Sequence, residues 1–518
     1  MGLPDGLADS LRDACYGVAG AVSAPVWGWS LWRTGKWKTD WRGKRGFVDA
    51  GTSSRDSASP GVAGRVLLHA VSVGETNLIR GLVAKLVEQG VEVVVSVTTD
   101  TGWATAQRLY GEMSGVSVVR YPLDFSWMVE RFLEAVKPDV VGLVELEVWP
   151  GFVVACKRRG IAVGVINGRL SEKSYGRYGL PGVKGLVRGT FGGLDFVAAQ
   201  NEAYAERFVG LGVAREKVAV LDTMKWDGAA GGMDEALREQ AERLAAEIGL
   251  NRGEAGRREG AEEEVSRGHS DTGEVAGTPR VPGEEPSTPR RQDAKTPSGE
   301  KVVVLGSTGD REEEELAVAI YNAWRQYGER SVDNRLRLLI VPRKPERFNQ
   351  VWLDLMGDYM AGGGFWGDEL MRRTLGEPFD PEPLSPYISA CLMDTMGELR
   401  ACYALADAVI VGRSFNGWGG SDPMEAAGLG VPSVMGPDHK NFEAVVSAMV
   451  DGGGLAVEAT PEAAAQRVVR WLTTEDGAAE AEAVGRAGKR VIEEHRGATD
   501  RHVALLMDWL SKTKRAKD

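Results

Sequence analysis

Short hydrophobic runs alternate with amphipathic segments along most of the chain. Arg65–Ala70 and Val91–Thr98 are valine-rich runs of strand length, whereas Ser126–Val136 repeats its hydrophobic positions with the period of a helix. Buried strands that alternate with helices are typical of a parallel sheet covered on both faces. We therefore predict a Rossmann-like domain over residues 61–228. Its predicted elements are Arg65–Ala70, Thr76–Gln89, Val91–Thr98, Trp103–Tyr110, Val116–Tyr121, Ser126–Val136, Val140–Val144, Phe152–Arg159, Ala162–Ile166 and Phe196–Ala199.

The same alternation restarts at Lys301 and predicts a second Rossmann-like domain over residues 301–495, followed by a C-terminal helix and tail over 496–518. The irregular stretch Asp358–Pro386 is interpreted as a loop excursion. The fold class inferred is α/β, with two such domains facing each other across a cleft. The predicted elements of the second half are Val302–Gly306, Glu312–Gln326, Arg337–Val341, Ala408–Val411, Val431–Met435, Pro461–Thr473, Ala478–His495 and Thr499–Lys512.

Residues 229–300 form the predicted linker. A helix is predicted over Met233–Leu250, and Asn251–Glu300 then contains no aromatic residue, leucine or isoleucine. Such a segment buries too little apolar surface to offset the entropy of ordering. We predict a disordered insert between the domains.

The first 60 residues carry the one membrane signal. Ala14–Trp32 contains no charged residue, and it is followed by the basic residues Arg33, Lys36, Lys38, Arg42, Lys44 and Arg45. Either this segment spans the bilayer, with the rest of the chain in the cytoplasm, or it lies in the interface with Trp27, Trp29 and Trp32 at headgroup level. Both alternatives predict attachment to the cytoplasmic membrane, where the basic flank meets anionic lipid.

Composition narrows the function classes. The net charge of −12 argues against a general nucleic-acid binder. The four cysteines have no CxxC spacing and the five histidines form no ligand-spaced pair, so a protein-held metal site is not expected. No cofactor is implied.

The stretch Leu392–Phe442 carries the densest chemical signal. It reads as a helix, a buried strand at Ala408–Val411, a glycine-rich loop, a second helix and a strand ending at Gly436-Pro437. Helix N-termini beside strand ends bind phosphates through backbone N–H groups. Asp422-Pro423-Met424-Glu425 has two compatible interpretations: a capping sequence that starts a helix, or a site in which Glu425 binds the hydroxyls of a ribose.

Several motifs in a fixed order resemble one family, the 3-deoxy-D-manno-octulosonic acid (Kdo) transferases of lipopolysaccharide synthesis, which have the GT-B fold. The motifs of the first domain are His69-Ala-Val-Ser-Val-Gly-Glu75, Thr98-Thr-Asp-Thr-Gly102, Tyr121-Pro-Leu-Asp124, Glu145-Leu-Glu-Val-Trp-Pro150 and Asn167-Gly-Arg-Leu-Ser171. Those of the second are Ser307-Thr308, Pro342-Arg-Lys-Pro-Glu-Arg347, Asp394-Thr-Met-Gly-Glu-Leu399, Gly419-Gly420, Glu425 and Gly436-Pro437.

The resemblance implies transfer of Kdo from CMP-Kdo to a lipid A precursor, lipid IVA, with inversion at the anomeric carbon and no protein-bound metal. Arg343 would meet the donor's phosphate or carboxylate, and Glu425 its ribose. The donor-side residues implied are Ser307, Thr308, Arg343, Gly397, Glu398, Gly420, Asp422 and Glu425. Those implied on the acceptor side are Ser72, Gly74, Glu145, Asn167 and Arg169.

One departure from the family concerns the catalytic base. The family places a glutamate shortly after the N-terminal segment, where this chain has Gly43 or Lys44. A protonated lysine cannot accept the acceptor's proton. Asp40 and Glu75 are the two candidates, and the choice between them stays open.

A second departure concerns the donor. Ser421 and Asp422 replace the residues usual in the family, and Asp422 adds negative charge near an anionic ligand. Two alternatives to Kdo transfer are therefore kept: a GT-B glycosyltransferase with an altered donor or acceptor, and a non-catalytic relative that binds nucleotide or lipid.

Overall fold

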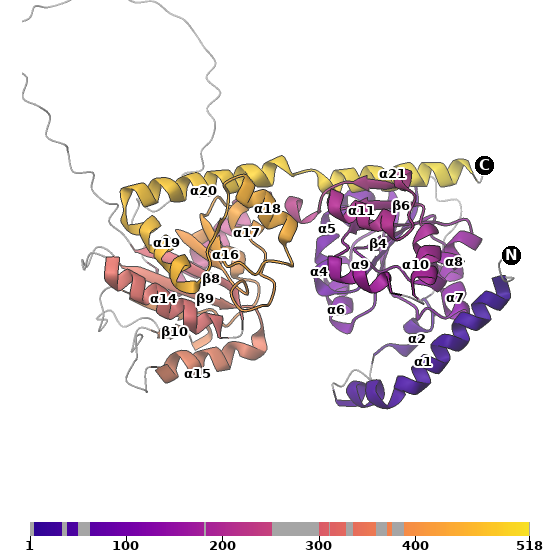
Figure 1. Cartoon of the computed structure of the whole chain (residues 1–518), viewed down its shortest axis with the longest axis horizontal. Coiled ribbons are helices and arrows are strands. Elements are labelled where there is room, and N and C mark those ends of the chain that lie inside the picture. Colours follow the sequence, from indigo (N-terminus) through magenta and orange to yellow (C-terminus); the bar gives the residue numbers. More distant parts are fainter. Residues whose placement is uncertain are drawn as a thin grey trace, which may run out of the picture. The chain divides into compact units, whose positions relative to one another are not determined.

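The structure is a computed structural model that describes residues 5–33, 39–49, 63–180, 183–250, 300–309, 311–327, 335–358, 370–375 and 388–516. These residues form two compact units, each built on one parallel sheet (Figure 1). Unit 1 comprises Met1–Gly231 and Ile492–Asp518, and unit 2 comprises Gly232–Val491. The two parallel α/β domains predicted from the sequence are confirmed. The predicted insert Asn251–Glu300 lies outside the described residues, apart from Glu300.

Unit 1 is a seven-stranded sheet of order β3-β2-β1-β4-β5-β6-β7, with every neighbouring pair parallel. Its strands are β1 (Gly64–Ala70), β2 (Val91–Val97), β3 (Val116–Arg120), β4 (Val140–Val144), β5 (Ala162–Gly168), β6 (Phe196–Ala199) and β7 (Val218–Val220). Its helices are α1 (Asp5–Arg33), α2 (Trp41–Lys44), α4 (Val73–Leu78), α5 (Arg80–Glu88), α6 (Asp100–Tyr110), α7 (Ser126–Val136), α8 (Pro150–Arg158), α9 (Glu172–Tyr178), α10 (Lys184–Gly192), α11 (Glu202–Gly210), the 3-10 helix η2 (Arg215–Lys217), α12 (Lys225–Ala229) and α21 (Ala498–Arg515).

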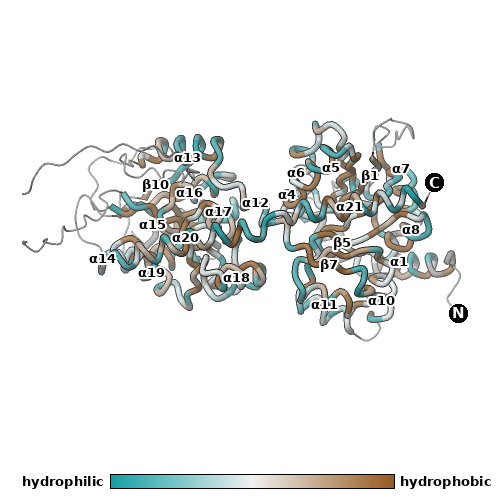
Figure 2. Tube along the Cα trace, turned by 90° about the horizontal axis from the view of Figure 1, so that it is seen from above, coloured by the Kyte–Doolittle hydropathy of each residue, from teal (hydrophilic) through white to brown (hydrophobic). Residues whose placement is uncertain are grey.

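The core of unit 1 lies on both faces of its sheet. Every residue of β1, β4, β5 and β6 is buried, as expected of strands covered on both sides. The hydrophobic colour of β5 contrasts with the mixed colours of the helices around it (Figure 2). One cluster packs beneath α7, α8 and α11, and the other beneath α5, α6 and α21.

The C-terminal helix α21 is part of unit 1. It packs against α5, β4 and β5. Buried His502 accepts a hydrogen bond from the backbone N–H of Asn167 through Nε2 at 3.0 Å, and its Nδ1 lies 2.7 Å from the Ala498 carbonyl oxygen. The last helix therefore closes the first domain.

Unit 2 is a second seven-stranded parallel sheet, of order β10-β11-β9-β8-β12-β13-β14. Its strands are β8 (Lys301–Thr308), β9 (Leu336–Pro342), β10 (Leu370–Arg372), β11 (Ile388–Leu392), β12 (Ala408–Val411), β13 (Ser433–Met435) and β14 (Ala456–Val457). Its helices are α13 (Glu235–Glu247), α14 (Glu312–Tyr327), η4 (Pro345–Arg347), α15 (Phe348–Asp358), η7 (Arg373–Leu375), α16 (Leu399–Leu405), α17 (Met424–Gly428), α18 (Glu443–Asp451), α19 (Pro461–Thr473) and α20 (Glu475–Glu494).

Three local predictions are corrected. The helix expected over Thr76–Gln89 is two helices, α4 and α5, which meet at Ile79. The excursion predicted over Asp358–Pro386 contains an edge strand, β10, that pairs with β11. The helix predicted after Asp422 begins at Met424, with Pro423 as the N-cap residue rather than as the first helical residue; the Asp422 carboxylate accepts the N–H of Met424 at 2.9 Å.

The N-terminal helix α1 docks on unit 1 through polar contacts. The Tyr16 hydroxyl donates to Asp124 at 2.9 Å, and the Asp13 carboxylate accepts the N–H of Ser126 at 3.0 Å. These contacts lie along one face of the helix. They fix α1 beside α7.

The face of α1 that makes no such contacts carries a row of exposed hydrophobic side chains, at spacings of four and seven residues. This row, called the α1 row below, consists of Leu7, Leu11, Val18, Val22 and Trp29. Such spacing places them on one side of a helix. Among the helices of the described residues, none is long and apolar enough to cross a membrane.

Candidate functional site

The carboxyl ends of the central strands of unit 2 bring the predicted donor residues together. β8 lies between β9 and β12 in the sheet. The strands that precede β12 in the chain lie on one side of β8, and β12 and the strands that follow it lie on the other. Ligands of doubly wound sheets bind at such a switch point. Thr308 ends β8, Arg343 follows β9, and Gly412 opens the loop after β12. The N–H of Arg343 donates to the Thr308 carbonyl oxygen at 3.1 Å.

The loop after β12 is held by Glu312, the first residue of α14. The Glu312 carboxylate accepts the N–H groups of Arg413, Ser414 (2.9 Å) and Phe415 (3.2 Å). Burial raises the pKa of this carboxyl to about 6, although the three N–H groups act in the opposite direction. The sequence analysis missed this residue, whose signal is no more than an acidic first turn at a helix start.

Three cations surround this loop. The guanidinium of Arg413 lies 5.5 Å and Nζ of Lys344 lies 5.7 Å from the ring centroid of Trp418. Burial and the neighbouring Arg413 lower the pKa of Arg343, while Asp422 opposes that shift. An anionic ligand would relieve the repulsion among these cations. Arg413 was also missed from the sequence, because no motif marks it.

Glu425 lies beside this cationic cluster. Burial raises its pKa to about 7, the nearby Asp422 raises it further, and Arg400 and Arg343 oppose the shift. A half-buried carboxyl with its cations nearby can accept hydrogen bonds from ligand hydroxyl groups. The Asp422 carboxylate accepts the N–H of Met424, the first residue of α17, in agreement with the capping interpretation. The ribose role of Glu425 stays a prediction.

Backbone geometry keeps the remaining donor-side residues close to β8. Ser307 has a φ of +55°, and its carbonyl oxygen accepts the hydroxyl of Ser421 at 2.9 Å. Gly420, at φ +78°, donates its N–H to the Arg413 carbonyl oxygen at 2.8 Å. The buried hydroxyl of Thr308 has no hydrogen-bond partner.

Gly397 and Glu398 start α16 at the end of β11. Gly397 has a φ of +90°, and Glu398 is the N-cap residue. The Glu398 carboxylate is engaged within the unit: it accepts the Thr395 hydroxyl and lies 3.3 Å from the Arg373 guanidinium. Binding of a nucleotide by the backbone groups of Gly397 and Glu398 stays a prediction.

The matching edge of unit 1 is centred on Glu75. One carboxylate oxygen accepts the N–H of Val71 at 2.5 Å and the other accepts the Ser72 hydroxyl at 3.2 Å, while the N–H of Glu75 donates to the same hydroxyl at 3.3 Å. This is a capping box. Burial, together with the charges of Glu145 and Glu147, raises the pKa of Glu75 to about 7, although the hydrogen bonds from Val71 and Ser72 act in the opposite direction.

The other acceptor-side residues occupy different positions. Gly74 is exposed in the first turn of α4, and Glu145 follows β4 at φ +59° with its carbonyl oxygen 3.4 Å from the N–H of Arg169. Asn167 has no exposed surface, and its side-chain oxygen accepts the N–H of Met224 at 3.0 Å. Asn167 therefore holds β5 against α12 rather than facing solvent.

Asp40 and Gly43 belong to the short helix α2. Asp40 is exposed, and its carboxylate caps α2 by accepting the N–H of Gly43 at 3.0 Å. A Cβ atom on Gly43 would lie 2.5 Å from Asp40 Oδ2 and 2.7 Å from Arg120 Cβ. Position 43, one of the two positions to which the resemblance assigns the glutamate, therefore has no room for a larger side chain unless its neighbours shift. Burial lowers the pKa of Lys44.

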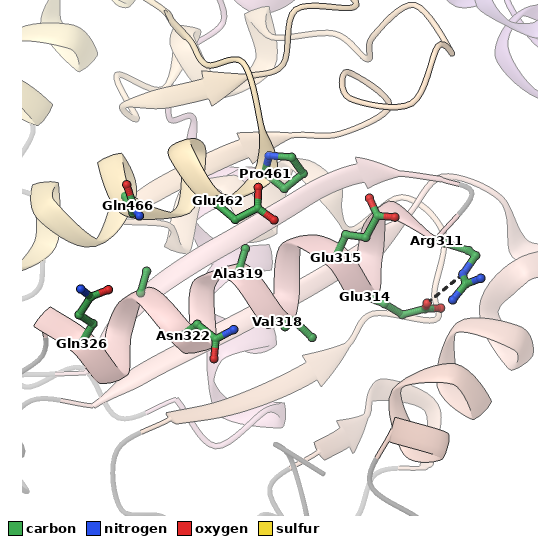
Figure 3. Close-up of a pocket in the computed structure, with 11 residues that line it drawn as sticks. Arg311, Glu314, Glu315, Val318, Ala319, Asn322, Gln326, Pro461, Glu462 and Gln466 are labelled. Atoms are coloured by element: carbon green, nitrogen blue, oxygen red, sulfur yellow. Dashed lines mark hydrogen bonds and ion pairs between the residues drawn. The ribbon is translucent and has the colours of Figure 1, made fainter. Parts of the chain in front are cut away.

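A hollow of about 480 Å³ lies between α14 and α19, away from the strand ends (Figure 3). Glu314 and Arg311, 3.4 Å apart, close one end of it, and Glu462 lies on α19. It contains none of the predicted donor residues. Across the described residues, no group of three or more His, Cys, Asp or Glu side chains is placed to hold a metal ion.

The fold defines the class of protein. Anabaena Alr3699/HepE, solved with UDP, is similar with a TM-score of 0.50 and 12% identity, covering 86% of this chain and 99% of that chain. Two parallel α/β domains, each with its polar groups at the carboxyl ends of the strands, are the architecture of GT-B proteins.

Sequence comparison then shows which proteins the chain is similar to. Residues 39–228 match the family model described as 3-deoxy-D-manno-octulosonic-acid transferase (kdotransferase). The 3-deoxy-D-manno-octulosonic acid transferase of Bordetella pertussis is 28% identical over 94% of this chain and 96% of its own length, and that of Haemophilus influenzae is 27% identical over 86% and 87%. Residues 39–228 thus resemble the Kdo transferase family, and most of the chain is similar to these two enzymes.

Proposed function

We propose that this protein transfers Kdo from CMP-Kdo to a lipid A precursor, with the donor on unit 2 and the acceptor on unit 1. The observation that carries the proposal is the cationic cluster of Arg343, Lys344 and Arg413 beside Glu425, at the switch point of unit 2. Three cations match the phosphate and carboxylate of the donor, and a carboxyl beside them matches its ribose.

Glu75 is the general base in this proposal. A carboxyl with a pKa of about 7 is half ionised near neutral pH, which suits a group that accepts a proton from a sugar hydroxyl. Asp40, the alternative, is exposed and already caps α2. The capping bonds of Glu75 fix the orientation of its carboxylate, so the same contacts that start α4 position the base.

The experiment is a turnover assay with CMP-Kdo and lipid IVA, in wild type and in Glu75→Gln and Asp40→Asn variants. We expect Kdo-bearing product and CMP from wild type, a loss of about 10²- to 10⁴-fold in kcat for Glu75→Gln, and little change for Asp40→Asn. The kcat/KM of wild type should rise with pH and level off above about 7. Loss of activity in Asp40→Asn with Glu75→Gln intact would reverse the assignment.

Two further measurements separate this function from its alternatives. CMP should raise the melting temperature more than UDP or GDP, because a ligand that binds the native state stabilises it by mass action. Turnover that survives a chelator supports the metal-independent reaction implied by the family. Stabilisation by UDP or GDP alone, or binding of CMP without any turnover, favours an altered donor or a non-catalytic relative.

We also propose that unit 1 lies on the cytoplasmic membrane surface. The α1 row is supported by a second exposed group, Phe47 after α2 and Trp127 on α7. Their ring centroids lie 4.1 Å and 5.3 Å from the Arg131 guanidinium. Aromatic rings with arginine are favourable at headgroup level. Interfacial binding, rather than spanning, is the alternative that this surface supports.

Vesicle flotation tests the membrane proposal. Wild type should float with vesicles that contain anionic lipid, and a Leu11→Glu/Val22→Glu variant should lose most of that binding, because each change places a charge in the apolar boundary. A Val220→Glu variant, exposed on β7, is the matched control. Equal flotation of all three proteins would exclude the α1 row as the contact.

A further inference from the structure

A pocket of about 330 Å³ lies on unit 1 between α1, the loop after β4 and α10. Its volume is within the range of small-ligand pockets, which begins at about 300 Å³. The inner wall is formed by buried Val187 and Phe191, whereas Leu186 is 59% exposed and Trp149 is 44% exposed. An apolar interior with a partly exposed apolar rim is unusual for a surface that meets only water.

Three of the hydrogen-bond donors that line this pocket are already used by the protein. The Tyr16 hydroxyl donates to Asp124 at 2.9 Å, the Thr190 hydroxyl to the Leu186 carbonyl oxygen at 2.9 Å, and Trp149 Nε1 to the Glu147 carboxylate at 3.2 Å. A ligand that needs hydrogen bonds would find these donors taken. The lining therefore favours a hydrocarbon chain over a polar group.

The pocket also adjoins the proposed acceptor edge. Glu147 lines the pocket, and its charge acts on Glu75, as does that of Glu145. Tyr16 brings α1 to the pocket, and the α1 row on the same helix is the surface proposed to lie on the membrane. A lipid that enters from the membrane would reach the pocket along α1, with its head group beside Glu75.

We propose that this pocket binds one acyl chain of the lipid acceptor, so that unit 1 selects its substrate by the acyl chain as well as by the sugar. This inference rests on the proposed function for the identity of the acceptor. The conclusion that the site takes an apolar ligand depends only on the residues that line the pocket. Each methylene buried there should strengthen binding about fourfold.

The first test compares two acceptors, lipid IVA and its fully deacylated sugar, in wild type, Leu186→Glu and the Val220→Glu control. Leu186 is exposed, so its replacement is not expected to unfold α10. We expect Leu186→Glu to raise KM for lipid IVA at least tenfold, with kcat and the donor KM unchanged, and to leave kcat/KM for the deacylated sugar as in wild type. An unchanged KM for lipid IVA, or an equal loss with both acceptors, would overturn the proposal.

The second test does not need turnover. Dibrominated stearate should quench the fluorescence of wild type more than that of Trp149→Phe, and Leu186→Glu should show reduced quenching. Lipid IVA should displace the probe, whereas phosphatidylethanolamine vesicles should not; equal displacement by both would assign the pocket to bilayer lipid and overturn the acceptor assignment. Equal quenching of wild type and Trp149→Phe would exclude an acyl chain at this pocket. If wild type is quenched but transfers no Kdo, the proposed function fails and the acyl site stands.

Discussion

Glu312 and Ser414 are joined by a hydrogen bond of 2.9 Å, in which the buried carboxylate at the start of α14 accepts a backbone N–H of the loop after β12. The two residues are 102 positions apart in the chain. Because the same carboxylate also accepts the N–H groups of Arg413 and Phe415, one side chain fixes three consecutive loop residues. The cationic cluster depends on this loop, since Arg413 belongs to both.

Glu312→Ala is therefore expected to damage stability and donor binding together. It leaves three N–H groups without their acceptor, which should lower the free energy of unfolding by about 3 kcal/mol. Arg413 would also lose the hydrogen bond that fixes its backbone, so KM for the donor should rise more than KM for the acceptor. Urea unfolding and initial-rate kinetics check both effects. Glu315→Ala, an exposed residue of the same helical turn, is the control, and a Glu312→Ala protein with wild-type stability would contradict this role.

Placing a glutamate at position 43, one of the two positions that the resemblance implies for it, is expected to fail. A Cβ atom at position 43 would lie 2.5 Å from Asp40 Oδ2 and 2.7 Å from Arg120 Cβ. Both Gly43→Ala and Gly43→Glu should therefore lose about 1–3 kcal/mol of stability, the usual cost of overpacking, and Gly43→Glu should not raise kcat. Thermal unfolding and the turnover assay provide the comparison. A gain in kcat for Gly43→Glu but not for Gly43→Ala would mean that α2 moves and that the carboxylate at 43 acts as base.

The sheets could be predicted from the sequence because their strands are continuous hydrophobic runs. β1, β4 and β5 are buried along their whole length, and the hydrophobic runs in their sequences indicate this burial on both faces. β7, β10, β11 and β14 were not predicted. β7, β10 and β14 are edge strands of two or three residues, too short to show a hydrophobic pattern, whereas β11, of five residues, lies between β10 and β9 and directly follows the stretch interpreted as a loop excursion.

The candidate site was predictable where its residues follow strands. Arg343 and Glu425, which the resemblance places on the donor side, lie close enough that each shifts the pKa of the other. Glu312 could not be found in this way, because its role depends on a loop far along the chain. Nor does a position after a strand reveal whether a side chain faces outward: Asn167, at the end of β5, is buried beneath α12 and α21.

Two buried histidines should make unit 1 sensitive to acid. Burial lowers the pKa of His502 to about 4 and that of His69 to about 3, below the ordinary value of 6.5. Between those values and 6.5 the unfolded state binds more protons than the native state, so stability should fall as pH decreases below about 6.5. The slope should be about 1.4 kcal/mol per pH unit for each histidine.

Urea unfolding of unit 1 at several pH values between about 7 and 5 measures this slope. His502→Gln should remove about half of it. The half-buried His439 lies in unit 2, so His439→Gln is a control for the loss of a histidine outside unit 1. A slope that is the same in wild type and His502→Gln would show that His502 is not held neutral in the native state.

Arg343 provides the sharpest test of the donor site. It follows the last residue of β9, and its backbone N–H is fixed by the hydrogen bond to Thr308. The positive charge of Arg413 nearby lowers the pKa of Arg343. A charge-assisted hydrogen bond to a phosphate or carboxylate contributes about 2 kcal/mol, so Arg343→Ala should raise KM for the donor about 30-fold. Arg343→Lys keeps the charge but not the bidentate geometry, so its KM for the donor should lie between those of wild type and Arg343→Ala. Arg325→Ala, exposed in the last turn of α14, is the control. Because Arg343 makes no capping or core contact of its own, the melting temperature should not change without the donor. A KM that rises only for the acceptor would move Arg343 out of the donor site.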